Sequence, residues 1–289
     1  MNSIDTLTPL DARGPGAGAW PPVGRSGFGA AWNNILAIAG VVIKELCRRK
    51  DFYVLFVLTA LITLVMGSVN FFNDDKMVRY LKEICLFLIW ASSLLIAITT
   101  AARQIPAERE NRTLFPLLAK PVTRHQLVLG KFAGCWLACG LALLVFYLFF
   151  GVVSATREHH FALVSYLQAL VLHWFMLGVV TSLTLLGSMV FAAPSSTNTI
   201  CFLVTAGILL LGRHLNKLAL QLSEPAQSFV YGIYYLVPHL EMFDVRDLIV
   251  HNWETIPWLI WAAACLYAVV YSGLFLAFAC LRFRRQAIN

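Results

Sequence analysis

Charged residues are scarce in this sequence: they make up 13% of its 289 positions, against roughly 25% in soluble domains. Hydrophobic residues make up 59%. A soluble fold of this length needs a charged surface that so few ionisable residues cannot provide, so we expect membrane lipid to solvate part of it. The seven cysteines lie in or beside apolar runs, which favours small packing residues over a disulfide framework.

The chain also lacks the glycine-rich loop with which ATPases bind phosphate groups. Its nearest match is Gly130-Lys131, which is followed by Phe132 and has His125 where the first glycine of that loop would stand. We therefore expect no nucleotide site, no cofactor and no catalytic activity in this chain. The net charge of +7 does not indicate nucleic acid, because the basic residues flank apolar runs instead of lining one face.

Acidic and basic side chains are missing from the middle of the apolar runs, where they would mark an ion or proton pathway. The one candidate for such a pathway is His173, close to the end of its run, which favours a packing or interfacial histidine over a transport residue.

Cys135 and Cys139 lie four apart and share a helix face, as two metal ligands would. Small residues at a close helix contact explain them better, and Gly130 with Gly134 has the same spacing.

The apolar runs predict an all-α, polytopic membrane protein with six transmembrane helices. A spanning helix needs about 20 mostly apolar residues. Five of the six runs meet this length. The remaining run, which is fifth in chain order, meets it only if its polar flanks are included. The predicted spans are 52–72, 84–102, 132–153, 170–193, 196–214 and 258–281.

Lys and Arg residues orient these spans. With the N-terminus inside, 15 of the 22 basic residues lie on the cytoplasmic side and 7 on the other. This agrees with the excess of Lys and Arg found in cytoplasmic loops. If the fifth run did not span, the arginines after the last span would lie outside, so the charge distribution favours six spans. We expect a cell (inner) membrane protein with both termini cytoplasmic, and a disordered tail over the Gly- and Pro-rich residues 1–28.

A basic amphipathic helix is predicted for residues 30–50, because Ile35, Ile38, Val42 and Leu46 recur at helical spacing. We expect it to lie in the membrane interface, where its basic end meets anionic lipid of the cytoplasmic leaflet. The alternative is an extension of the first span. The charged residues of this entry helix are Lys44, Glu45, Arg48 and Arg49.

The segment 216–256 before the last span is too apolar for a plain loop and too short to cross. Its tyrosines favour one or two short helices in or dipping into the outer leaflet, and a small extracellular cap is the alternative. Its polar part would supply the ligands if the protein were a membrane enzyme or assembly factor, although the spacing suits a polar loop better. These candidate ligands are His239, Glu241, Asp244, Asp247 and His251.

The loop 103–131 carries both charged and apolar side chains. Glu108 and Arg112 lie four apart and can pair on a helix surface, and Pro121 ends that helix. A compact helix held between two spans can transmit a push from a docked partner, whereas a passive interfacial turn is the alternative. The apolar ridge of this helix consists of Leu114, Leu117 and Leu118.

The order of residues in this loop is distinctive. It reads Ile105-Pro106-x-Glu108-x-Glu110-x-Arg112-Thr113, then LLAKPVTR over 117–124, then Gly130-Lys131. This pattern resembles the loop between the second and third spans of ABC-2-type transporter permeases. The basic entry helix, the six spans, the segment YYLVPHLEMFDVRD and the C-terminal FRR extend the resemblance along the chain. Pro116 inside the predicted helix is less typical of the family.

The resemblance implies that residues 29–289 form one ABC-2-type transmembrane domain, which exports an unidentified substrate or transmits force. Two such permeases, identical or paralogous, would pair, and each would rest on a cytoplasmic ATP-binding subunit. A stand-alone secondary transporter or channel, active without ATP, is the alternative. The resemblance assigns the ATPase-coupling role to Glu108, Arg109, Glu110, Arg112, Thr113, Leu114, Leu117, Leu118, Pro121 and Arg124.

Overall fold

The structure is a computed structural model that describes residues 28–48, 53, 57, 60–61, 64, 75–110, 123–155, 163–191, 193–251 and 253–285. Within these ranges every regular element is a helix, which confirms the predicted all-α fold. The helices are α1 Phe28–Cys47, α3 Asp75–Arg103, α4 Pro106–Glu110, α6 Arg124–Ala155, α7 Leu163–Val190, α8 Pro194–Ala219, α9 Ala226–Leu236, the 3-10 helix η1 Leu240–Phe243, α10 Arg246–Val250 and α11 Trp258–Arg285.

Four stretches of helix in the described part are long and apolar enough to cross a membrane. They are Lys82–Glu110, which joins most of α3 to α4, Arg124–Ala155, Leu163–Val190 and Trp258–Arg285. Each contains all or most of one predicted span, namely 84–102, 132–153, 170–193 and 258–281 in turn. With 28 to 32 residues, α6, α7 and α11 exceed the length of the hydrocarbon core, so their ends reach the polar zone.

The other two predicted spans are not settled by these helices. Span 52–72 lies largely outside the described residues, although its five described positions are all helical. Span 196–214 falls in α8, of which the fully described apolar stretch, Pro194–Leu210, is shorter than a membrane-spanning helix. The count of six spans therefore stays a prediction.

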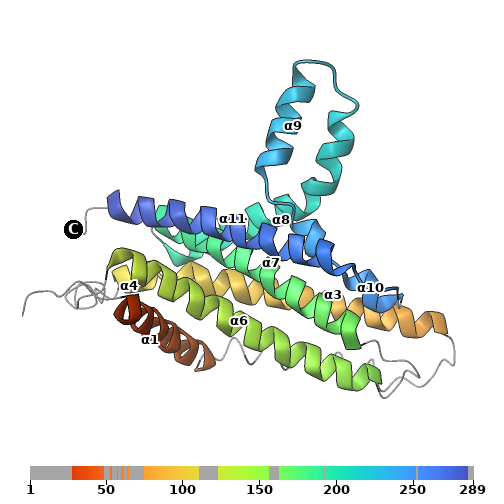
Figure 1. Cartoon of the computed structure of the whole chain (residues 1–289), viewed down its shortest axis with the longest axis horizontal. Helices are drawn as coiled ribbons and strands as arrows, with labels where there is room; N and C mark the ends of the chain where they lie inside the picture. Colours follow the sequence, from red (N-terminus) through yellow and green to blue (C-terminus); the bar gives the residue numbers. More distant parts are fainter. Residues whose placement is uncertain are drawn as a thin grey trace, which may run out of the picture.

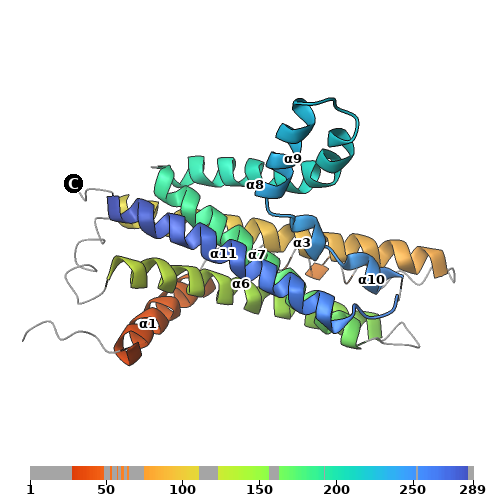
Figure 2. The same cartoon turned by 45° about the horizontal axis from the view of Figure 1, so that its top comes forward.

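The long helices α3, α6, α7 and α11 lie side by side, and α7 is at their centre (Figures 1 and 2). The C-terminal half of α7 carries four buried hydroxyl groups, from Thr181, Ser182, Thr184 and Ser188. Each donates to a backbone carbonyl three or four residues earlier, at 2.7 to 3.0 Å. Because an unpaired hydroxyl is costly in apolar surroundings, these bonds let small polar residues fill the crowded centre.

Two tryptophans join α6 to α7 by a reciprocal contact. Trp136 Nε1 donates to the carbonyl oxygen of Trp174 at 2.9 Å, and Trp174 Nε1 donates to that of Trp136 at 3.0 Å. Their ring centroids lie 4.6 Å apart. Each indole also covers a glycine of the opposite helix, since a Cβ added at Gly178 would lie 3.0 Å from Trp136 Nε1 and one at Gly140 would collide with Trp174. Both helices thus use the same pattern, Trp-x-x-x-Gly.

The end of α8 and the following α9 project sideways from the bundle as a hairpin (Figure 1). Leu220, Phe229 and Leu236 on this hairpin are 68%, 71% and 79% exposed. The tyrosine-rich part of segment 216–256 is helical, because it forms α9. Its placement in the outer leaflet stays a prediction.

The polar stretch after α9 packs onto the bundle. Leu240, Phe243 and Ile249 of η1 and α10 are buried. The guanidinium carbon of Arg246 lies 5.3 and 5.0 Å from the ring centroids of Phe87 and Trp90 on α3, within the range of a cation–π contact. This stretch is thus part of the folded bundle. We call this side, with the start of α7, the α10 end.

Candidate functional site

The predicted coupling loop begins at the opposite side of the bundle, where α4 lies beside the start of α6 and the end of α11 (Figure 1). We call this the α4 end. Ile105, in the turn between α3 and α4, is fully buried. It belongs to a cluster with Leu127 of α6, Met189 of α7 and Phe283 of α11. One apolar side chain therefore fixes the start of α4 against three long helices.

A buried ion pair then joins α4 to α6. The Nζ of Lys131 lies 2.7 Å from Oε1 of Glu108, and the two side chains are 6% and 18% exposed. Lys131 Nζ also donates to Oε1 of Gln104 at 3.2 Å. A buried ammonium requires such partners because its desolvation is costly. The sequence predicted Arg112 as the partner of Glu108, but Arg112 lies outside the described residues, and the structure adds Lys131.

Arg124 connects the start of α6 to the end of α11. Its guanidinium donates to the carbonyl oxygens of Phe283 and Arg284 at 3.0 and 3.3 Å, and it lies 5.7 Å from the ring centroid of Phe283. The last four carbonyls of a helix have no partner within it, and a positive charge there complements the helix dipole. Arg124 thus caps α11 from the neighbouring helix.

The first turn of α6 is fixed by a capping box. Gln126 N–H donates to Oγ1 of Thr123 at 3.3 Å, and Thr123 N–H donates to Oε1 of Gln126 at 3.1 Å. This reciprocal pair satisfies two backbone donors that the helix leaves open. It holds the turn that carries Arg124 and leads to Lys131.

Helix α1 packs against this same part of α6, at two glycines. A Cβ added at Gly130 would lie 2.8 Å from Cβ of Ile38, and one added at Gly134 would lie 2.7 Å from Cβ of Val42. Because real Cβ atoms do not approach so closely, only glycine permits this distance between the helices. Cys135 is buried in the same contact, as expected for a small packing residue.

The surface of the α4 end is rich in basic groups. Arg103 and Glu110 are exposed, and Arg109 lies within electrostatic reach of Arg282 on α11. Lys44 and Glu45 of α1, and Arg48 just after it, are also exposed, but they lie farther along α6, because Val42 and Leu46 pack at Gly134 and Cys135. The structure therefore brings together Glu108, Arg109, Glu110 and Arg124 of the predicted coupling set. The remaining predicted residues lie outside the described part: Arg49, Arg112, Thr113, Leu114, Leu117, Leu118 and Pro121.

A family model described as ABC-2 family transporter protein matches residues 52–287 of this chain. The chain belongs to this family. No curated protein matches the sequence. Membership makes the chain a multi-pass membrane protein and a permease subunit of an ABC transporter, and it implies association with an ABC ATP-binding subunit.

A second polar cluster lies inside the membrane domain of this ABC-2 permease. His173 of α7 is 3% exposed. Its Nε2 lies 2.8 Å from Oγ of Ser93 on α3, and its Nδ1 lies 3.5 Å from the hydroxyl of Tyr147 on α6. Both ring nitrogens therefore face polar partners from two neighbouring helices, which fits the predicted packing histidine.

The polar residues of the α10 end do not gather into a ligand set. In the part of the permease that the structure describes, no three His, Cys, Asp or Glu side chains could hold one metal ion. Asp244 instead binds Arg246 through two bonds of 2.6 and 2.8 Å. Burial lowers the pKa of Arg246, but these bonds and the charge of Asp244 outweigh it, so the pKa lies above its usual value and the guanidinium stays charged.

Proposed function

We propose that this ABC-2 permease couples ATP hydrolysis by a separate cytoplasmic ATPase subunit to export of a substrate, or to force transmission across the membrane. The observation that supports this coupling is the buried ion pair between Glu108 and Lys131. It joins α4, the described start of the loop that the ATPase would contact, to the long helix α6.

A push on α4 would reach the other helices through contacts already formed. Separating this largely buried ion pair leaves the Lys131 ammonium without its carboxylate, which is unfavourable away from water, so α4 and α6 move together more easily than apart. Arg124 extends the connection to α11, and Gly130 and Gly134 extend it to α1. The α4 end would thus respond to the ATPase as one unit.

In this proposal the α4 end faces the cytoplasm, with both termini on that side of a cell (inner) membrane and six spans in all. The basic residues gathered there support this orientation, because cytoplasmic loops are enriched in Lys and Arg. A second permease copy or a paralogue would complete the membrane unit. All nucleotide chemistry would belong to the ATPase subunit.

The test is co-expression with the ATPase subunit, co-purification, and measurement of ATP hydrolysis with and without the permease in proteoliposomes. We expect the permease to change the hydrolysis rate, and Glu108→Gln to abolish most of this change while the subunits still co-purify. Glu83→Gln is the matched control, because Glu83 is exposed near the opposite end of the same long apolar stretch.

Two results would contradict the proposal. One is a permease that binds no ATPase subunit and moves solutes in liposomes without ATP, as a stand-alone carrier or channel would. The other is full coupling in the Glu108→Gln variant, which would show that the ion pair transmits nothing.

A further inference from the structure

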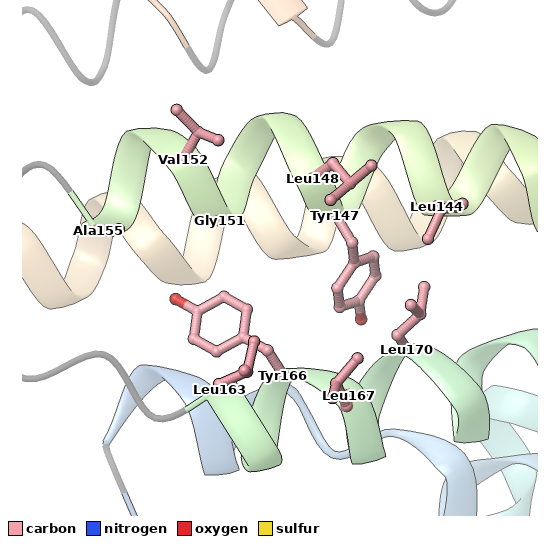
Figure 3. Close-up of a pocket in the computed structure, with 10 residues that line it drawn as sticks. All are labelled: Leu144, Tyr147, Leu148, Gly151, Val152, Ala155, Leu163, Tyr166, Leu167 and Leu170. Carbon is pink, nitrogen blue, oxygen red and sulfur yellow. The ribbon is translucent and has the colours of Figure 1, made fainter.

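An apolar groove lies between α6 and α7, toward the α10 end (Figure 3). Its volume is about 290 Å³, and all of its lining residues belong to these two membrane-spanning helices. Gly151 lies on its α6 side. Figure 3 shows Tyr147 of α6 and Tyr166 of α7 pointing into the space between the helices.

The two tyrosines do not make the groove polar, because their hydroxyl groups have partners within the protein. The hydroxyl of Tyr166 donates to Oγ of Ser154 at 2.9 Å, and that of Tyr147 lies 3.5 Å from Nδ1 of His173. What remains for an occupant to touch is almost entirely hydrocarbon: aromatic rings, leucine and valine side chains and backbone carbon.

We infer that this groove binds one acyl chain of a phospholipid from the surrounding leaflet. Three of its lining residues, Leu148, Val152 and Leu167, are 59%, 64% and 51% exposed, so the groove opens sideways from helices that cross the membrane. The contents of such an opening come from the bilayer that surrounds it. The inference concerns the membrane domain alone and does not depend on the ATPase.

Water does not suit this groove. An apolar cavity of about 150 Å³ stays dry and accepts benzene instead, and this groove is larger and equally apolar. A side chain from a helix of a second permease is the competing occupant, and cross-linking between permease copies tests for it. A single hydrocarbon chain is thin enough to enter.

The attraction comes from close packing, because a chain leaves one hydrocarbon medium for another and gains nothing from the hydrophobic effect. Dispersion contacts with the two rings and the surrounding methyl groups supply it. A weak site is still occupied in a bilayer, since the lipid is the solvent. Filling the groove should therefore displace the chain without changing the neighbouring lipid-facing surface.

The experiment uses the full chain in nanodiscs that contain a phosphatidylcholine with a photoactivatable diazirine on its acyl chain. Labelled residues are mapped by mass spectrometry. We expect labelling at Leu148 and Leu167, and a decrease there of about fivefold or more, equivalent to about 1 kcal/mol, in the variant Gly151→Leu. Labelling at Val270, exposed on α11, should not change. Gly273→Leu is the control, because a Cβ there meets no atom within 4 Å.

Two outcomes would overturn the inference. Equal labelling of the groove in Gly151→Leu and Gly273→Leu would mean that lipids only surround the helices. Cross-links between permease copies at the groove would mean that a side chain of a second copy fills it. If Gly151→Leu does not fold, Ala155→Leu makes the same test, since Ala155 lines the groove and is exposed.

Discussion

The contact between Trp136 and Trp174 predicts that glycine is required at position 140. An alanine Cβ at Gly140 would collide with the Trp174 indole, so the ring must move and lose its bond to the carbonyl of Trp136. Since the rings are stacked, the bond in the other direction weakens too.

The magnitude follows from these losses. Each hydrogen bond between membrane helices contributes ~0.6 to ~1.7 kcal/mol, and the ring pair adds ~1 kcal/mol. Against this, alanine is a better helix former than glycine by ~1 kcal/mol. We expect Gly140→Ala to lower the free energy of unfolding by about 2 kcal/mol.

The matched control is Gly273→Ala on α11, where an added Cβ meets nothing within 4 Å. It gains the helix propensity without a collision, so its free energy of unfolding should stay equal or rise by up to ~1 kcal/mol. Both variants are measured by SDS titration of the purified permease in mixed micelles, followed by circular dichroism. If Gly140→Ala is as stable as Gly273→Ala, the tryptophan contact does not hold α6 against α7.

Three further changes test other contacts. Thr123→Ala removes one half of the capping box and should cost about 1 kcal/mol, seen as faster hydrogen exchange confined to the first turn of α6. Arg246→Gln removes a half-buried ion pair and two aromatic contacts; we expect a loss of about 2 kcal/mol in the same unfolding assay. Gly134→Leu should displace α1, so that a cysteine placed at Val42, which is 2% exposed, reacts with maleimide; Gly40→Leu, which has open space, should leave that cysteine protected.

The membrane-spanning helices could be predicted because the signal is local. A run of about 20 apolar residues is visible without knowledge of its neighbours, and the four long apolar stretches agree with it. The close approach at Gly130 and Gly134 was equally visible as a small-residue spacing. The short run in α8 is ambiguous for the same reason, since the polar residues 197–199 and Arg213 lie close to its two ends.

The partners within the site could not be predicted because they are distant in the chain. Lys131 meets Glu108, and Arg124 meets the carbonyl of Phe283, only after the helices have packed. Arg246 likewise reaches the rings of α3, so a stretch that reads as a polar loop folds against the bundle.

Two other features had a local signal that was not used. Thr123-x-x-Gln126 is the pattern of a capping box and marks the start of α6. The repeat of Trp-x-x-x-Gly at Trp136 and Trp174 indicated that the two helices share one kind of contact. The second pattern becomes informative once a small residue is sought opposite each large one.

The most direct test of the coupling mechanism is a charge exchange between α4 and α6. Glu108→Lys and Lys131→Glu are each made alone and then together, and ATP hydrolysis by the permease–ATPase complex is measured in proteoliposomes. The present charges lie 2.7 Å apart, and each single change replaces this attractive pair with two like charges at the same place. We therefore expect both single variants to uncouple the complex. The double variant restores an ion pair and should recover a large part of the coupled rate. A double variant as inactive as the single ones, or single variants that remain fully coupled, would contradict transmission through this pair.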